Sequence, residues 1–148
     1  MRSYWRLLAL MPLALTLGLA ACGSGRATTG PTATSAPSGQ CPASAGLPAT
    51  VSDHGSIVDS GSHLTIEADD FFFSATCVTG VHTGTVTLVV HNGGQMLHNV
   101  TIPPLNIDMD VPPGQTITLQ VQMGNTPLVF FCKYHKGVGM YGALLPPG

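Results

Sequence analysis

Short runs of residues that alternate between apolar and polar side chains occupy most of the chain from Val51 onward. Successive side chains of a β-strand point to opposite faces, so each run presents one apolar face and one polar face. The clearest runs, residues 85–90 and 116–121, place aliphatic side chains on one face and mainly Thr or Gln on the other. No stretch repeats its apolar residues with a helical period. We therefore expect an all-β fold.

The length and spacing of the runs predict one domain built as a Greek-key sandwich of two sheets. Gly, Pro, Asn and Asp interrupt the runs, and the chain contains 18 Gly and 12 Pro among 148 residues. About a hundred residues with such punctuation suit a small β-sandwich. The expected strands are residues 63–68, 71–74, 84–91, 98–102, 115–122, 128–132 and 141–145.

The first 21 residues have the layout of a secretory signal. Arg2 and Arg6 precede an apolar run, residues 7–19, and small residues follow. The sequence Leu19-Ala20-Ala21-Cys22 resembles the lipobox of bacterial lipoproteins, in which the cysteine is acylated and becomes the mature N-terminus. We expect a signal peptide at residues 1–21, lipidation of Cys22, and an extracytoplasmic protein held at the cell membrane by its lipid anchor alone. Plain secretion is the alternative.

A linker and an acidic net charge follow from the composition after this signal. Residues 23–50 are almost entirely Gly, Ser, Thr, Ala and Pro, so we expect a disordered tether at residues 22–50 and a folded domain at residues 51–148. Without residues 1–21 the chain keeps three basic and seven acidic residues, a formal charge of 3 − 7 = −4. This charge argues against a nucleic acid as partner.

A thiol, an imidazole and a thioether lie at short spacing near the C-terminus. Cys132 is followed after two residues by His135, which is followed after four residues by Met140. Gly137 and Gly139 permit a tight turn that brings the three side chains toward one point. Soft sulfur and imidazole donors favour copper, and one Cys, two His and a weak axial Met form the ligand set of electron-transfer copper centres. The sequence therefore predicts a copper site whose second histidine ligand comes from another part of the chain.

His98 is the best candidate for the missing histidine. It follows the turn Asn92-Gly93-Gly94 and opens the alternating run 98–102, which places His98, Val100 and Ile102 on one face at the rim of the core. We expect the other upstream histidines to be surface residues: His54, His63, His82 and His91. Met96, Met109 and Met123 compete with Met140 but lack its fixed spacing from Cys132.

Residues 62–146 resemble the cupredoxins of plastocyanin type, which are small blue-copper proteins. The resemblance rests on Asn92, on His98-Asn99-Val100, on Pro112-Pro113-Gly114 and on the motif from Phe131 to Gly142. It implies one copper ion, Cu(II) or Cu(I), with His98, Cys132 and His135 as equatorial ligands and Met140 as the axial ligand. It also implies that the side chain of Asn99 ties the two ligand segments together.

The chain departs from multicopper enzymes and carries two additional cysteines. It has no second trio of copper ligands and no two-Cys loop of a binuclear oxidase subunit, so we expect one mononuclear site and no enzymatic activity. Cys22 lies in the lipobox and Cys132 in the metal loop, which leaves Cys41 and Cys77 as a possible disulfide. A Cys132–His135 nucleophile pair, or a buried Cys beside a surface His, would not explain Met140 and His98 together.

The expected function is single-electron transfer between redox partners at the outer face of the cell membrane. The edge of His135 would pass the electron, and Met96, Val138, Lys133 and Lys136 would form the docking surface for a transient contact with a membrane-associated redox protein. The lysines would steer an acidic partner, since we expect the acidic residues, Asp53 to Asp110, to lie elsewhere. A copper carrier or buffer of the cell envelope is the main alternative, and a metal-free binding module is a third.

Overall fold

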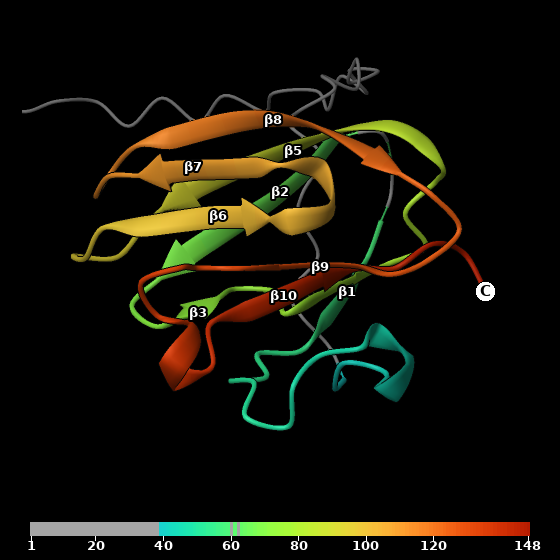
Figure 1. Cartoon of the computed structure of the whole chain (residues 1–148), viewed down its shortest axis with the longest axis horizontal. Coiled ribbons are helices and arrows are strands. Elements are labelled where there is room, and N and C mark those ends of the chain that lie inside the picture. The colour runs from blue at the N-terminus through green and yellow to red at the C-terminus, as the bar shows by residue number, and fades with distance from the viewer. Residues whose placement is uncertain (1–38, 60, 62) are drawn as a thin grey trace, which may run out of the picture. The chain divides into compact units, whose positions relative to one another are not determined.

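The computed structural model describes residues 39–59, 61 and 63–148, and these form two packed β-sheets (Figure 1). The expected signal peptide, the lipidation site Cys22 and the tether up to residue 38 lie outside the described residues. Among the residues that the structure describes, the only helices are the single 3-10 turns η1 (Ala43–Ala45), η2 (Pro103–Leu105) and η3 (Lys136–Val138). None of them is long and apolar enough to cross a membrane. The prediction of an all-β sandwich is confirmed.

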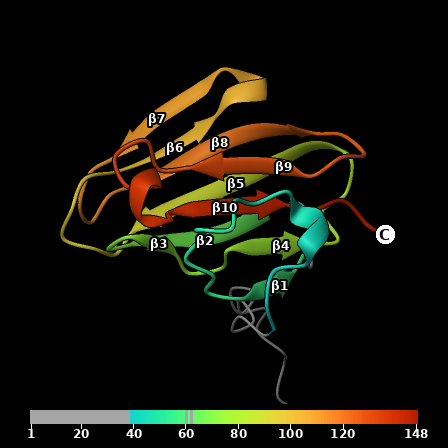
Figure 2. The same cartoon turned by 60° about the horizontal axis from the view of Figure 1, so that its bottom comes forward.

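One sheet has six strands and the other has four (Figure 2). The six-stranded sheet has the order β1 (Ser56–Val58), β4 (Cys77–Thr79), β10 (Tyr141–Leu144), β9 (Leu128–Phe131), β6 (His98–Ile102) and β7 (Ile107–Val111). The four-stranded sheet has the order β3 (Phe72–Phe73), β2 (His63–Asp69), β5 (Gly84–Asn92) and β8 (Thr116–Met123). Neighbouring strands are often distant in sequence, so the chain crosses repeatedly between the sheets.

Alternating burial along the strands forms the core between the two sheets. In β5 the side chains of Val86, Leu88 and Val90 are fully buried. On the opposite face, Thr85 and Thr87 form hydrogen bonds with Gln122 and Gln120 of β8. The expected division between an aliphatic inner face and a Thr and Gln outer face is therefore correct.

The seven predicted strands match observed strands to within one residue at each end, but three strands were missed. β1 and β4 have only three residues each, too few for a visible alternation. β7 is an edge strand of the six-stranded sheet and carries Asp108 and Asp110. Charged residues are common on edge strands because they prevent pairing with other molecules. The two aspartates interrupt the apolar pattern of β7, so the sequence did not predict this strand.

The expectation of a tether through residue 50 is wrong for residues 39–50. Cys41 forms a disulfide with Cys77 of β4, as the cysteine count suggests. Ala45 is buried in a small cluster with Cys77, Ala143 and Leu145, and Leu47 packs against this cluster. Residues 39–50 are therefore part of the folded domain, because a disulfide and one local cluster compensate for the poor composition of the segment.

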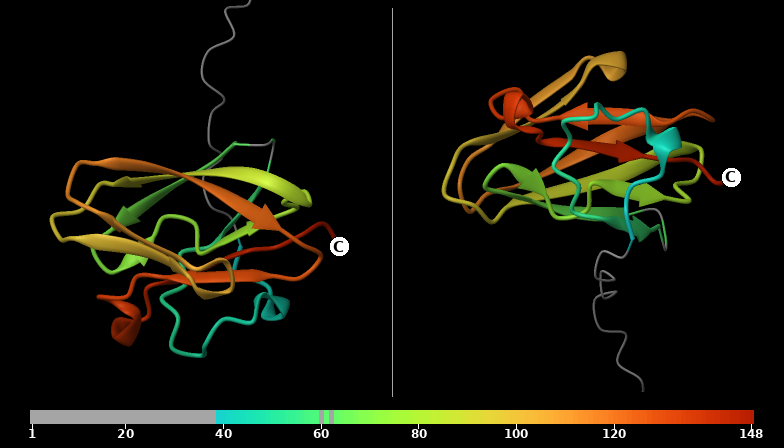
Figure 3. Two further views of the ribbon diagram at one scale, coloured as in Figure 1. Left: turned by 45° about the horizontal axis from the view of Figure 1, so that its top comes forward. Right: turned by 90° about the horizontal axis from the view of Figure 1, so that it is seen from below.

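The segments expected to hold the metal meet at one end of the sandwich (Figure 3). β6 begins with His98, whereas β9 ends at Phe131, just before Cys132. The two strands are antiparallel neighbours, with Thr101 opposite Phe131. The sheet therefore places His98 and Cys132 at the same end.

Candidate metal centre

The loop from Cys132 to Met140 closes on itself through backbone hydrogen bonds. The amides of His135 and Lys136 donate to the Cys132 carbonyl oxygen at 3.1 and 2.8 Å. The Met140 amide donates to the His135 carbonyl at 3.3 Å, and the Cys132 amide donates to the Met140 carbonyl at 3.1 Å. The three predicted ligands of this loop are therefore fixed relative to one another by their own backbone.

The side chains of His98, Cys132 and His135 converge. One possible donor atom from each of them lies within 4.8 Å of the others. The Cys132 sulfur is 3.4 Å from Nδ1 of His135, and the two imidazole rings have their centroids 5.0 Å apart. His98 and Cys132 are fully buried, whereas His135 is half-buried. This cluster has the spacing that a single metal ion needs.

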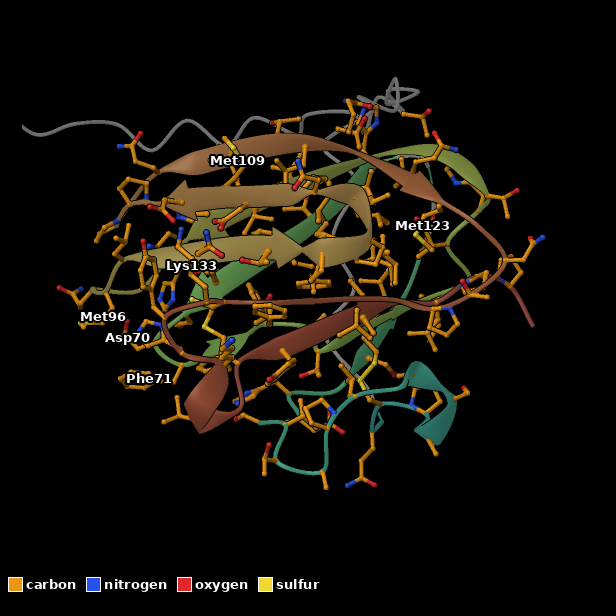
Figure 4. The ribbon with its side chains drawn as sticks, in the orientation of Figure 1. Asp70, Phe71, Met96, Met109, Met123 and Lys133 are labelled. Carbon is orange, nitrogen blue, oxygen red and sulfur yellow. A yellow bond between two sulfur atoms is a disulfide. The ribbon has the colours of Figure 1, made fainter. Side chains whose placement is uncertain are left out.

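Met140 belongs to the same buried region. Its side chain is completely buried and shares the main hydrophobic core with Cys132. Two of the competing methionines, Met96 and Met109, have exposed side chains. The third, Met123, is packed in the core at the opposite end of the molecule from Met96 (Figure 4). Met140 is therefore the methionine that the loop holds beside the His and Cys donors.

The environment of His98 fits a bound metal. Both ring nitrogens of His98 are buried, and neither has a hydrogen-bond partner among the described residues. An unsatisfied buried polar group costs about 1 to 3 kcal/mol, so such a histidine normally binds something. Burial and the neighbouring His135 lower the pKa of His98, which keeps the imidazole neutral and able to act as a ligand. Copper, with its preference for sulfur and imidazole donors, suits this set.

Asn99 connects the β6 strand to the metal loop. Its side-chain amide donates to Asp108 at 2.7 Å and to Asp110 at 2.9 Å, and its side-chain oxygen accepts from the Lys133 amide at 3.4 Å. Asn99 is itself fully buried. Asn99 therefore lies between the two ligand segments, where the resemblance to cupredoxins places it.

The expectation that the acidic residues lie away from the metal loop is wrong. The Lys133 ammonium group is 2.8 Å from Asp108 and 2.9 Å from Asp110, and the Tyr134 hydroxyl donates to Asp110 at 2.9 Å. The hydrogen bonds from Lys133 lower the pKa of both carboxyl groups, and the same contacts raise the pKa of Lys133. β7 brings these carboxylates to the loop by pairing with β6, a contact that the sequence did not reveal.

Two residues of the turn between β2 and β3 also reach the cluster, and sequence reasoning missed both. Asp70 places a carboxylate oxygen 3.6 Å from Nε2 of His98. Phe71 packs edge-on against His135, with the ring centroids 5.1 Å apart at 88°. Phe71 has a positive φ of 75°. Only the unusual run Asp69-Asp70 before three phenylalanines marked this turn in the sequence, and nothing there linked it to the metal loop.

The predicted docking residues differ in their environment. Met96 and Val138 are exposed to 47% and 61%. Lys136 is exposed, with its ammonium group 5.3 Å from the centre of the Phe131 ring. Lys133 is paired with Asp108 and Asp110, whose two negative charges exceed its single positive charge. The four upstream histidines do not join the cluster: His54, His63 and His82 are exposed, and His91 is half-buried beside Thr116.

Comparisons with known proteins support the fold at the level of three-dimensional structure. No family model matches the sequence. No curated protein matches it either. Auracyanin from the photosynthetic bacterium Roseiflexus castenholzii, in a dithionite-reduced form, superposes with a TM-score of 0.52 at 19% identity, over 61% of this chain and 99% of that chain.

Two further solved structures have lower similarity. Amicyanin from Paracoccus versutus gives a TM-score of 0.47 at 16% identity, over 70% of this chain and 87% of that chain. A copper-containing nitrite reductase from Thermus scotoductus gives 0.44 at 16% identity, over 57% of this chain and 27% of that chain.

The two-sheet sandwich is therefore a cupredoxin fold, and the His98, Cys132 and His135 cluster is consistent with a type 1 copper site. The likeness to auracyanin extends over nearly all of that protein. A fold alone does not decide function, which depends on the chemistry of the site.

The two glycines of the metal loop have different roles, which two substitutions can separate. Gly139 has a φ of 96°, and an added Cβ would collide with the Thr50 carbonyl oxygen and lie 2.8 Å from the Ser52 amide. An added Cβ at Gly137 meets nothing within 4 Å, and its φ is not positive. Gly139→Ala is expected to lower the free energy of unfolding by at least about 1 to 2 kcal/mol, and Gly137→Ala by less than about 0.5 kcal/mol.

The measurement is urea denaturation of the metal-free protein. An equal loss of stability in the two variants would contradict the assignment of the tight approach to Gly139.

Proposed function

We propose that this protein is a mononuclear type 1 copper protein that carries single electrons between redox partners at the outer face of the cell membrane. The observation that carries the proposal is the convergence of a free buried Cys132 with two imidazoles, and the ring nitrogens of one of them, His98, have no hydrogen-bond partner among the described residues. Copper bound here would supply a one-electron couple between Cu(I) and Cu(II).

The residues around the cluster suit electron transfer because they resist movement. His98 lies in a strand paired on both sides, and the loop carrying Cys132, His135 and Met140 is closed by backbone hydrogen bonds. A rigid donor set reduces the rearrangement that accompanies a change of oxidation state, and this rearrangement otherwise slows electron transfer. The half-buried ring of His135 is the route by which an electron would reach the surface.

Exposed apolar residues suggest how a redox partner docks. Met96 and Val138 would form the contact, with Lys136 at its edge. Lys133 contributes less than expected from the sequence, since its charge and those of Asp108 and Asp110 sum to 1 − 2 = −1. We therefore infer a small, transient and mainly apolar contact with a membrane-associated redox protein.

The location is proposed from the sequence. The layout of residues 1–21 and the lipobox-like Leu19-Ala20-Ala21-Cys22 support secretion and acylation of Cys22. Lipid anchoring would confine the domain to the membrane surface, where it would meet a membrane-associated partner.

Copper loading tests the proposed cofactor and role. The protein with added Cu(II) is expected to develop an intense visible absorption from the bond between thiolate and copper, to bleach on reduction with ascorbate and to recover on reoxidation. Cys132→Ser should lose the band entirely, whereas the paired change Cys41→Ser with Cys77→Ser should keep it. A colourless protein that binds Cu(I) and yields it readily to a chelator would instead identify a copper carrier.

The docking surface can be tested without knowing the partner, because two copies of the protein can exchange electrons. Val138→Asp places a charge in the proposed contact and is expected to reduce the self-exchange rate by roughly tenfold, the effect of about 1.4 kcal/mol. Val58→Asp is the matched control, since Val58 is also exposed, at 69%, but lies in β1, an edge strand of the six-stranded sheet, and not in the metal loop. Line broadening in mixed Cu(I) and Cu(II) samples gives the rate, and equal effects would rule out this surface.

Acylation can be tested in a bacterial host that processes lipoproteins. The full chain is expected to incorporate labelled palmitate and to fractionate with membranes, and Cys22→Ser should abolish both properties. Membrane association that persists in Cys22→Ser would contradict the lipid anchor.

A further inference from the structure

The turn between β2 and β3 contributes Asp70 to the metal centre from the sheet opposite the ligands. β2 and β3 belong to the four-stranded sheet, whereas His98 and the metal loop extend from the six-stranded sheet. Asp70, Phe71 and Met96 lie together at the end of the sandwich that holds the site (Figure 4). Asp70 thus belongs to neither of the segments that carry the predicted ligands.

The carboxylate of Asp70 is held in place by backbone donors. Its Oδ1 accepts hydrogen bonds from the amides of Gln95 at 3.0 Å and Met96 at 3.2 Å. The backbone amide of Asp70 donates to Asp69 at 2.7 Å. A Cβ on Gly94 would collide with the Asp70 carboxylate, so the loop before His98 can approach the turn only because a glycine stands there. These contacts fix the position of the carboxylate.

The same oxygen faces one nitrogen of His98. Oδ1 of Asp70 is 3.6 Å from Nε2, slightly longer than a hydrogen bond, and the His98 side chain is completely buried. A carboxylate at this distance favours a proton on Nε2, because the N–H dipole points toward the negative charge. A neutral imidazole that is protonated on Nε2 has its free lone pair on Nδ1. Histidines that bind metals commonly direct their other N–H toward a carboxylate, which orients the ring and raises its basicity.

We propose that Asp70 is a positioning residue for the metal centre: its carboxylate holds the His98 imidazole with the proton on Nε2 and the Nδ1 lone pair free for the metal. This role rests on the proposed copper function. It also implies that a negative charge lies close to one ligand, which stabilises Cu(II) relative to Cu(I) and lowers the reduction potential.

The first test uses the copper-free protein and the nitrogen chemical shifts of the His98 ring in NMR spectra, which distinguish the two neutral tautomers. Wild-type protein is expected to hold the Nε2–H tautomer, and Asp70→Asn a mixture with the Nδ1–H tautomer. Asparagine can still accept the Gln95 and Met96 amides through its side-chain oxygen. Glu67→Gln is the matched control, since it also removes one carboxylate near the β2–β3 turn, but from an exposed β2 side chain that lies against Gly93.

The second test measures Cu(II) affinity and reduction potential in the same variants. Asp70→Asn should bind Cu(II) roughly 10- to 100-fold more weakly and have a higher potential, while Glu67→Gln stays close to wild type. Gly94→Ala, which displaces the carboxylate without removing it, should shift both the tautomer ratio and the affinity in the same direction as Asp70→Asn. This variant preserves the test if Asp70→Asn does not fold.

The two proposals fail in different ways. An unchanged His98 tautomer and an unchanged potential in Asp70→Asn would overturn the role of Asp70 while copper binding by the wild type stands. A wild-type protein that binds no copper would overturn the proposed function, and the tautomer measurement on copper-free protein would still report whether Asp70 orients His98.

Discussion

Burial of alternate side chains between the two sheets is the interaction on which the metal centre depends. His98 shares the inner face of β6 with Val100 and Ile102, so the burial of these aliphatic residues also draws the imidazole inside. Cys132 and Met140 belong to the same hydrophobic cluster. A shift of one residue in the register of β6 would turn His98 to the other face of the sheet. The same apolar packing that stabilises the fold therefore selects which donors meet.

The predictable part of the site is the part set by local sequence. Cys132, His135 and Met140 lie within one tight loop, and His98 could be chosen because its strand has a clear alternation of side chains. Asp70 could not be found in this way, since its approach to His98 depends on how the β2–β3 turn and the loop before β6 pack together. Contacts between residues distant in sequence leave no periodic pattern. The strands β1 and β4 could not be predicted for a different reason, since three residues are too few to show an alternation.

The charge around the metal loop differs from the charge that the residues of the loop alone suggest. Lys133 is one of two lysines in the loop, and the sequence alone suggests a positive docking surface. The antiparallel pairing of β6 with β7 places Asp108 and Asp110 against Lys133, so these three side chains together carry a formal charge of 1 − 2 = −1. The same contacts connect the loop to the sheet through Asn99. Lys133 therefore contributes more to holding the loop against β7 than to attracting a partner.

The proposed lipid anchor would give the disulfide near the start of the described chain a mechanical consequence. A pulling force that enters at residue 39 reaches Cys41 first and passes through the covalent bond into β4, which pairs with both β1 and β10. The segment that follows, including Thr50 and Ser52 against Gly139 of the metal loop, is bypassed by this load path. With the proposed anchor, the Cys41–Cys77 disulfide would carry this tension into β4 instead of through residues 42–76.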